Sequence, residues 1–542
     1  MCGCPTSANV VHSSPEPPTE KSAELANSSI SRSVGNISTS PAKGLACSLS
    51  VNQTFKLVGI GCCLTCITNF PSAFMHTSVN TAVMELNSYL NESYTNRGTQ
   101  LTDQHFSLLR SAINSCWYAG QIVGALCSPR LCDKYGRKPA YILATAMMTL
   151  ACALQMLATL FPYPEVMVFG RLMASVFSPM SDTVAILYLQ EISPTHLRGA
   201  LSSLFATGYS AMGLLGMLLG IRPLLGHSLT LLFFVPVLPG ILSVLFLAWI
   251  PETPKFLMIA KGDEEAARRS LIFFQGPMGS NEQALKDYQQ EAQDNGDTQG
   301  MVSVYGALSS PCFVPLSDGH GANFGLLQIG AKADTELNNS GCLSAMVRAP
   351  GKNSLAQLSS SLMMVLLTVS CVFAAFLVDR FPRRHLFLSV GAFSVFLLVL
   401  FVVGAALSPV VPSARFVAVT GMMAYIVSYG LAIGPISYFI APELVPMAHR
   451  SSMFCLSFSL ISLLITVSSD NATGARLVGP LSFGPLFAVP SLLSLLYLYL
   501  YLPETKGRET HQIVAQLKGR RKSSDSNWRR RRNFDDVIAE GG

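Results

Sequence analysis

The stretch Asp133-Lys134-Tyr135-Gly136-Arg137-Lys138 returns 246 residues later as Asp379-Arg380-Phe381-Pro382-Arg383-Arg384. Two further features repeat in the same order, each 252 residues later: Glu191 with Arg198 returns as Glu443 with Arg450, and Pro251-Glu252-Thr253 returns as Pro503-Glu504-Thr505. Each match is short, but the nearly constant offset argues against chance. Because internal repeats decide the architecture, the chain is predicted to consist of two halves in parallel repeat.

Long apolar runs between these motifs indicate the class of the protein. The 542 residues are 50% hydrophobic and only 13% charged, whereas about a quarter of a soluble domain is charged. Each run approaches the ~20 residues that cross a bilayer as a helix, which excludes a string of soluble domains. We predict eleven spans, at residues 57–76, 111–129, 139–164, 172–190, 199–221, 228–250, 353–378, 386–414, 416–442, 451–469 and 477–502.

The distribution of basic residues gives the topology. Lys and Arg cluster after the second, sixth and last runs and before the run at 386–414, so these segments and both termini are predicted to be cytoplasmic. The parity of crossings then requires one more span between about residues 300 and 352, and the repeat offset places it near 303–328. Pro311, Pro315 and Asp318 interrupt that segment, so both a degenerate seventh helix and a segment that does not cross remain open.

The predicted fold is therefore an all-α membrane protein with two six-helix halves and twelve helices, the seventh degenerate. The domains expected are a disordered cytoplasmic tail at 1–54, a six-helix bundle at 55–254, a cytoplasmic helical loop at 255–300, a second bundle at 301–503 with 301–352 irregular, and a basic cytoplasmic tail at 504–542. In the last tail, Trp528 and the arginines at 529–532 either contact anionic lipid or remain solvated.

Composition also excludes several functions. The net charge of +6 reflects topology, so no nucleic-acid partner is expected, and the 14 cysteines show neither a zinc spacing nor a disulfide framework. No nucleophile motif or phosphate loop is found, so we expect neither an enzyme nor a cofactor.

The repeated motifs lie at predicted cytoplasmic helix ends, where carboxylates and arginines of neighbouring helices can pair. Each such pair contributes little in wet surroundings, yet a network that forms in one conformation can bias a two-state equilibrium. We interpret the motifs as a cytoplasmic gate; the alternative is loop charge that only fixes orientation. The gate residues are Asp133, Gly136, Arg137, Glu191, Arg198 and Glu252 in the first half, and Asp379, Arg383, Glu443, Arg450 and Glu504 in the second.

With these motifs, and with Gly434-Pro435-Ile436-Ser437-Tyr438-Phe439, the chain resembles the sugar porter family of the major facilitator superfamily, especially its facilitative hexose transporters. The resemblance implies alternating access around a monosaccharide site near the bilayer midplane, in a multi-pass protein of the plasma membrane. It also exposes departures where substrate is expected to bind. A family glutamine falls on Ala206, a tryptophan on Tyr438 and an Asn-Trp pair on Ile461-Ser462, and residues 301–335 lack the family's seventh-helix signature.

Six residues are candidates for the substrate path: Tyr209, Tyr429, Tyr438, Gly434, Pro435 and Asp182. The tyrosines could offer hydroxyls and ring faces to a sugar, or pack between helices. Gly434-Pro435 could act as a hinge or form a static kink. Asp182 lies mid-span and could contact substrate, carry a proton or be partnered within the bundle.

The functional prediction is facilitative uniport of a monosaccharide, because the first run lacks the aspartate that proton-coupled members of this family carry. The alternatives are a transport-deficient sensor or scaffold, a variant isoform, or a carrier of a less polar solute. Three sequons are glycosylation candidates: Asn91 in the first predicted outside loop, and Asn338 and Asn471, which are outside only if the chain crosses twelve times.

Overall fold

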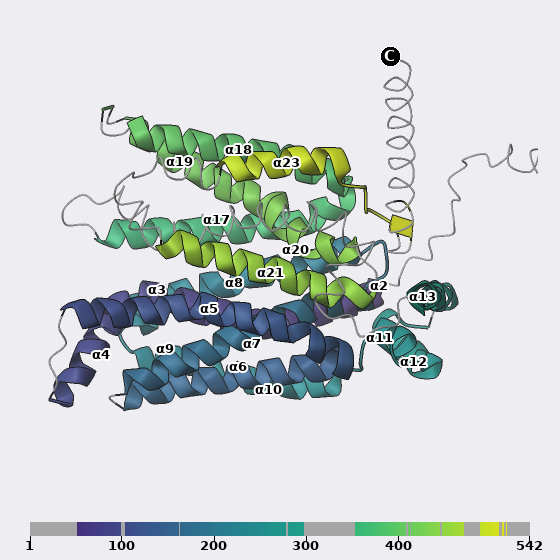
Figure 1. The fold of residues 1–542 in the computed structure, drawn as a ribbon, viewed down its shortest axis with the longest axis horizontal. Coiled ribbons are helices and arrows are strands. Elements are labelled where there is room, and N and C mark those ends of the chain that lie inside the picture. Colours follow the sequence, from purple (N-terminus) through teal and green to yellow (C-terminus); the bar gives the residue numbers. More distant parts are fainter. Residues whose placement is uncertain are drawn as a thin grey trace, which may run out of the picture. The chain divides into compact units, whose positions relative to one another are not determined.

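Helices form every regular element of the part of the chain that the computed structural model describes (Figure 1). That part comprises residues 51–98, 103–161, 163–277, 280–296, 353–407, 410–411, 413–444, 447–470, 488–508, 512–513 and 516. The chain divides into the units Met1–Ser48 and Leu49–Gly542, and all described residues belong to the second. The predicted seventh crossing, Asn338, Asn471 and the arginines at 529–532 lie outside the described residues.

The first half contains long helices that match its six predicted spans. They are α2 (Val51–Asn69) continued through the π-helix η1 (Phe70–Phe74) into α3 (Met75–Thr81), α5 (Asp103–Tyr135), α6 (Arg137–Leu160), α7 (Pro164–Ile192), α8 (Arg198–Leu219), and α9 (Leu229–Phe234) followed by α10 (Val237–Trp249). The short π-helix η2 (Arg222–Gly226) precedes α9. Helix α2 begins at Val51, within the segment expected to be a tail. Asn91 is exposed on a helix, α4 (Val83–Asn96), rather than in a loop.

The second half repeats this pattern. It contains α17 (Asn353–Arg380), α18 (Arg383–Leu407), α19 (Ala414–Ser428), the π-helix η5 (Tyr429–Ile433), α20 (Gly434–Glu443), α21 (Met447–Asp470) and α23 (Val489–Tyr501). Between the halves lie α11 (Pro254–Ile259), α12 (Glu264–Gln275) and α13 (Ser280–Gly296). Figure 1 shows these three helices beyond one end of the long helices.

Eight of the helices in the described residues are long and apolar enough to cross a membrane. They correspond to eight of the eleven predicted spans, and α5, α21 and α23 overlap the other three. One helix end differs from the prediction. The span was expected to stop at Pro129, but α5 continues through this proline to Tyr135. A proline removes one backbone hydrogen bond, which neighbouring helices can compensate within a membrane bundle.

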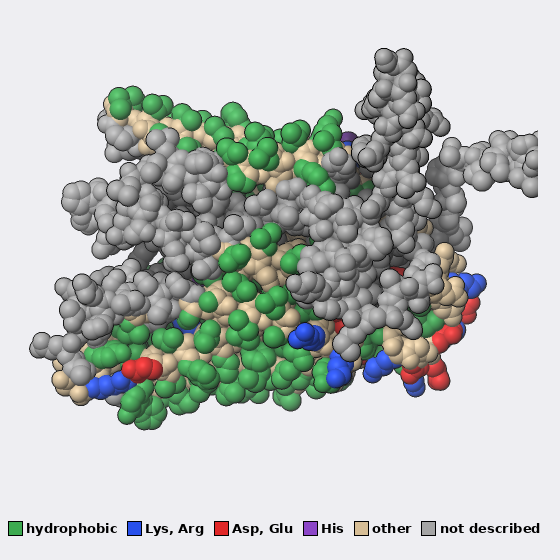
Figure 2. All heavy atoms as spheres, in the orientation of Figure 1, with side chains coloured by type: hydrophobic (Ala, Val, Ile, Leu, Met, Phe, Trp, Pro, Cys, Tyr) green, Lys and Arg blue, Asp and Glu red, His purple; other side chains and the backbone are tan. Residues whose placement is uncertain are grey.

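Large apolar side chains cover the flanks of the long helices, as Leu245, Phe169 and Phe376 do with 63%, 58% and 69% of their surface exposed. Figure 2 shows hydrophobic side chains along the length of the bundle and charged ones gathered near α11–α13. Exposure on this scale would cause a soluble protein to aggregate, but it suits contact with lipid chains. The surface therefore agrees with a membrane-spanning fold.

The two halves meet where α5 packs against α21 and where α8 packs against α17. Glycines hold α5 close to its neighbour α7: a Cβ atom on Gly124 would lie 1.8 Å from the carbonyl oxygen of Val176. Close backbone approach at small residues is a common way to pack helices in membranes. One face of α5 is thus fixed within its own half, while α21 of the other half packs on it as well.

Candidate functional site

One end of the bundle, next to α11–α13, concentrates buried charge; we call it the charged end and define it by Arg137, Glu191, Arg383 and Glu443. Arg137 is the first residue of α6 and only 1% exposed. Its Nε donates to Glu191 Oε1 at 3.1 Å and its Nη1 to Asp133 Oδ1 at 3.4 Å. A buried arginine is tolerated only when it is paired in this way.

Glu252 caps the same helix. Its carboxylate accepts the backbone N–H of Lys138 at 3.0 and 3.1 Å and that of Thr253 at 2.9 Å, so it satisfies donors that the first turn of α6 leaves open. Burial raises the pKa of Glu252, and the backbone donors oppose that shift. Gly136 precedes the helix at φ +107°, a conformation that favours glycine.

The second half reproduces this arrangement at the repeated residues. Arg383 Nη1 donates to both carboxylate oxygens of Glu443, at 2.9 and 2.7 Å, and Arg383 Nη2 lies 3.7 Å from Asp379 Oδ1. Glu504 accepts the backbone N–H groups of Arg383 and Arg384 at 3.0 and 3.1 Å, as Glu252 does for α6. The sequence repeat is therefore a repeat of one capped, buried ion-pair cluster.

Both arginine–glutamate pairs join helices of the same half, so different contacts connect the halves. Asp133 Oδ1 accepts a hydrogen bond from Ser451 Oγ at 2.7 Å, and Asp379 Oδ2 accepts one from the backbone N–H of Ala200 at 2.9 Å. Ser451 lies near the start of α21 and Ala200 near the start of α8, so each aspartate reaches the same place in the opposite half. These contacts join the two halves at the charged end.

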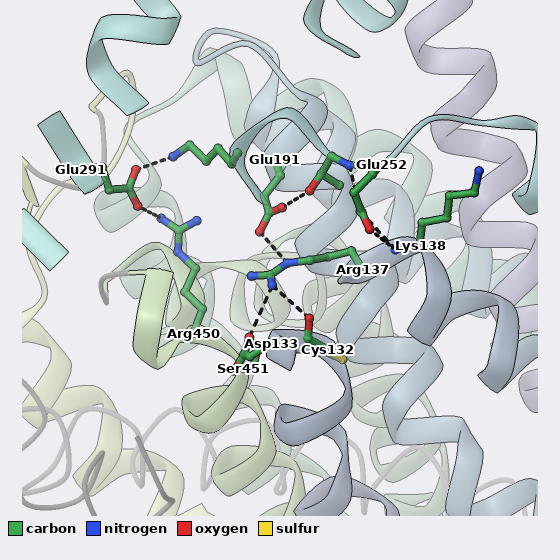
Figure 3. A network of polar contacts seen from close by, with 11 residues as sticks. Cys132, Asp133, Arg137, Lys138, Glu191, Glu252, Glu291, Arg450 and Ser451 are labelled. Carbon is green, nitrogen blue, oxygen red and sulfur yellow. Dashed lines mark hydrogen bonds and ion pairs between the residues drawn. The ribbon is translucent and has the colours of Figure 1, made fainter. Parts of the chain in front are cut away.

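Glu291 of α13 adds a third connection, which Figure 3 shows beside the Arg137 cluster. Its Oε2 accepts from Lys255 Nζ at 2.7 Å and its Oε1 from Arg450 Nη2 at 3.2 Å. All three side chains are at most 5% exposed. Because Lys255 lies in α11 and Arg450 in the first turn of α21, Glu291 joins two loop helices to each other and to the second half.

Sequence reasoning missed Glu291, because it has no repeated counterpart. The signal that could have found it is a spacing of three on α13, which puts it on one face with Leu285 and Tyr288; these are 3% and 4% exposed. Arg198, which the sequence grouped with the gate, is buried as the first residue of α8.

The substrate-path candidates lie deeper in the bundle. Tyr429 and Tyr438 are buried, Tyr209 is half-buried, and the ring of Tyr438 meets the ring of Phe205 edge-on at 5.2 Å. Gly434 and Pro435 begin α20 directly after the π-helical turn η5, so the helical hydrogen-bond pattern changes where the sequence indicated a break, but the helix runs on without interruption over Phe416–Ile440. This aromatic contact joins α20 of the second half to α8 of the first.

Asp182 is 7% exposed in the middle of α7, beside a chain of hydroxyl groups. Ser181 Oγ donates to Thr68 Oγ1 at 3.2 Å, and Thr68 in turn shares a hydrogen bond with the hydroxyl of Tyr141. The polar interior of the first half is thus continuous between α2, α6 and α7 near this carboxyl group.

Two further polar contacts cross between the halves at mid-helix, and sequence reasoning did not identify them. Ser462 Oγ of α21 donates to Gln121 Oε1 of α5 at 3.3 Å, and Thr207 Oγ1 of α8 donates to the carbonyl oxygen of Cys371 of α17 at 3.2 Å. Both Gln121 and Ser462 are buried. Within the described residues, the α5–α21 and α8–α17 contacts thus each include one polar contact at the charged end and one further along, and Gln190 Nε2 of α7 also donates to the carbonyl oxygen of Phe439 of α20 at 2.8 Å.

Comparison with known proteins decides the family. A family model described as "Sugar (and other) transporter" matches residues 61–517. The chain belongs to the sugar (and other) transporter family. The resemblance inferred from the motifs is confirmed, and the family is one of transporters.

Individual relatives extend this result. The chain is 23% identical to mouse "Solute carrier family 2, facilitated glucose transporter member 7" over 80% of this chain and 85% of the relative, and 26% identical to human member 5 over 84% and 91%. The structure of the proton:xylose symporter XylE bound to 6-bromo-6-deoxy-D-glucose matches with a TM-score of 0.71 at 16% identity, covering 86% of this chain and 99% of XylE. The chain therefore has the major facilitator fold, as its sequence predicted.

Proposed function

We propose that this protein carries a monosaccharide such as glucose or fructose down its gradient by alternating access. Membership of the family, and similarity to proteins named facilitated glucose transporters, support the substrate class. The observation that carries the mechanism is the pair of contacts, Asp133 with Ser451 and Asp379 with Ala200, by which each half holds the helix start of the other.

The charged end is proposed to be the cytoplasmic gate, in its closed form. Breaking a buried ion pair costs about 3–5 kcal/mol, whereas a neutral hydrogen bond contributes about 1 kcal/mol and one to a charged group about 1.5–3. Arg137–Glu191 and Arg383–Glu443 lie within single halves, so they can persist as each half moves as a unit. Among the described contacts, opening breaks the two aspartate bonds, the Glu291–Arg450 pair and the bond from Gln190 Nε2 to the carbonyl oxygen of Phe439 at 2.8 Å. Water pairs with the released groups in the open form, which lowers the net cost of opening.

The substrate path is proposed to run past Tyr209, Tyr429 and Tyr438. The change from the π-helical turn η5 to α20 at Gly434-Pro435 is proposed as the point where this helix bends. The edge-on contact of Phe205 with Tyr438 supports this assignment, because a path between the halves must pass residues that join them. Asp182 is proposed to orient the neighbouring hydroxyls rather than to carry a proton, since the first span supplies no acidic partner between residues 57 and 76.

We also propose that the protein lies in the plasma membrane, with the charged end and both termini on the cytoplasmic side. This orientation places α4 outside, where Asn91 is exposed and available as a glycan acceptor, and α11–α13 inside. The basic C-terminal tail would then face the anionic inner leaflet.

Transport by the purified protein in liposomes tests this function. We expect saturable uptake of at least one labelled hexose that stops at equal concentrations inside and outside, with no accumulation when a proton gradient is imposed. Accumulation driven by protons would replace uniport with symport, and uptake equal to that of protein-free liposomes for every hexose would remove the transport proposal.

A further inference from the structure

Beside the gate, two lysines and two aromatic rings form one continuous surface at the charged end. Lys56 of α2 donates to the carbonyl oxygen of Phe273 at 2.7 Å and lies 4.2 Å from the centre of its ring. The ring of Phe273 meets that of Trp249 edge-on at 5.5 Å. Lys138 of α6 donates to the carbonyl oxygen of Ala248, next to Trp249, at 2.8 Å.

We call Lys56, Phe273, Trp249 and Lys138 the aromatic–lysine surface. It joins four helices: α2 and α6 bring the lysines, α10 ends at Trp249, and α12 brings Phe273 in its last turn. The loop helix α12 therefore contacts the membrane bundle here through an ammonium group and an edge-on pair of rings. Its acidic residues, Glu264 and Glu265, lie in its first turn, at the opposite end of a helix about 18 Å long.

The surroundings of this surface are those of a membrane boundary. Trp249 is 65% exposed; Phe55, which precedes Lys56 in α2, and Ile272, which precedes Phe273 in α12, are 72% and 42% exposed. Tryptophan and lysine gather at the level of lipid headgroups, where the ring lies among the glycerol groups and the ammonium reaches the phosphates. A soluble anion would use the lysines but leave these apolar side chains in water.

We propose that the aromatic–lysine surface binds an anionic phospholipid of the leaflet on the side of the charged end. Each ammonium group has three N–H donors, and the recorded bonds of Lys56 and Lys138 each engage one with a helix carbonyl. The remaining donors suit the phosphate oxygens, while Trp249, Phe55 and Ile272 contact the glycerol and acyl region. The nearby Glu252 is engaged by backbone N–H groups.

The binding has a structural consequence. A lipid held by Lys56 and Lys138 at once would tie α12 to α2 and to the first turn of α6, the turn that Glu252 caps and that places Arg137. It would thereby hold the loop helices against the first half. Lys138 meets the gate residue Glu252 only through its backbone N–H, so its ammonium group is available to lipid, and the proposal does not rest on the proposed substrate.

Quenching of Trp249 by brominated lipids tests the proposal. The full-length protein is reconstituted in phosphatidylcholine bilayers containing either brominated phosphatidylserine or brominated phosphatidylcholine, and the signal of a Trp249→Phe variant is subtracted to isolate Trp249. We expect phosphatidylserine to be preferred about fivefold to twentyfold. Lys56→Gln and Lys138→Gln are each expected to lower the preference about fivefold, since one basic residue at an anionic surface contributes about that factor.

Matched variants separate specific binding from other causes. Lys286→Gln removes the same charge from an exposed position on α13 and is expected to leave the preference unchanged, and Lys56→Arg is expected to retain it. A wild-type preference near one, or a preference insensitive to Lys56 and Lys138, would overturn the proposal. Loss of the preference in millimolar inorganic phosphate, or an equal loss in Lys286→Gln, would also overturn it, by showing a soluble-anion site or a general charge effect.

Discussion

Asp379 of the second half accepts a hydrogen bond at 2.9 Å from the backbone N–H of Ala200, in the first turn of a helix of the first half. A carboxylate there satisfies an open donor and meets the positive end of the helix dipole. The contact connects the halves without an ion pair between them. It is one of the contacts that must break if the charged end opens as the proposed gate.

Gly199 makes this contact possible, and its replacement should weaken it. A Cβ atom at Gly199 would lie 2.2 Å from Asp379 Oδ1 and 2.6 Å from Arg383 Nη2, so in Gly199→Ala the carboxylate must move away from Ala200. Loss of a hydrogen bond to a charged group costs about 1.5–3 kcal/mol, which is about tenfold or more in the closed-to-open ratio. Maleimide labelling of Cys455, which is 1% exposed in the third turn of α21, should accelerate by that factor.

Two internal references make this measurement specific. Cys152 is fully buried within the first half, so its labelling should not change if the halves separate as units. Gly59→Ala adds a methyl group with nothing within 4 Å and should leave Cys455 protected. Equal acceleration at Cys152 would indicate unfolding instead of opening.

Glu291→Gln should destabilise the closed protein more than any exposed charge change on the same helix. It leaves Lys255 and Arg450 buried without their carboxylate, a change that costs about 3 kcal/mol or more. Glu282→Gln is the control, because Glu282 is 69% exposed and 3.7 Å from Arg268, and its effect should be within about 1 kcal/mol. Thermal unfolding in detergent measures the loss of stability, and labelling of Cys455 measures opening. Similar results for both variants would refute the role of Glu291.

The mid-helix contact between Gln121 and Ser462 should couple the halves independently of the charged end. In a double-mutant cycle of Gln121→Leu and Ser462→Ala, we expect a coupling free energy of about 1 kcal/mol in the closed-to-open equilibrium, measured from the labelling rate of Cys455. Additive effects would mean that the two side chains do not act as a pair across the seam.

Gly136→Ala should lower stability through both backbone strain and crowding of the helix cap. Gly136 has φ +107°, and an added Cβ would lie 2.5 Å from Glu252 Oε2 and 2.9 Å from Phe256 Cε1. Gly262→Ala is matched, since Gly262 has φ +69° but open space around it; it should cost about 1–2 kcal/mol from strain alone. If Gly136→Ala costs no more than Gly262→Ala in a thermal unfolding series, Glu252 does not fix the start of α6.

The sequence predicted the parts of this structure that depend on local pattern or on repetition. Apolar runs indicate helices wherever a bilayer must be crossed, and the repeats of Arg137 and Glu252 predicted clusters that the fold brings together. Contacts between unrelated segments left no such signal: Gln121 and Ser462 lie 341 residues apart, and Glu291 acquires its role only when α13 packs between Lys255 and Arg450. The helix end predicted at Pro129 was wrong, because neighbouring helices in a bundle can compensate for one lost backbone hydrogen bond.

Asp182→Asn should leave the pH dependence of transport unchanged, because the carboxyl group is proposed to orient hydroxyl groups and not to carry a proton. Initial rates of hexose uptake from pH 5 to 8 check this, with wild type and a protonophore as references. A wild-type rate that rises with an inward proton gradient and loses that response in Asp182→Asn would instead assign proton coupling to this residue.

Counterflow of a labelled hexose in liposomes containing the purified protein tests the central claim most directly. Liposomes preloaded with unlabelled sugar should accumulate the label transiently without any ion gradient, because a carrier that alternates between two faces exchanges substrate in both directions. Gly199→Ala should alter the rate of this exchange, while Gly59→Ala should not. Suppose that no hexose shows more counterflow than protein-free liposomes do, although protection of Cys455 from labelling shows that the protein is folded. That result would contradict a sugar uniporter.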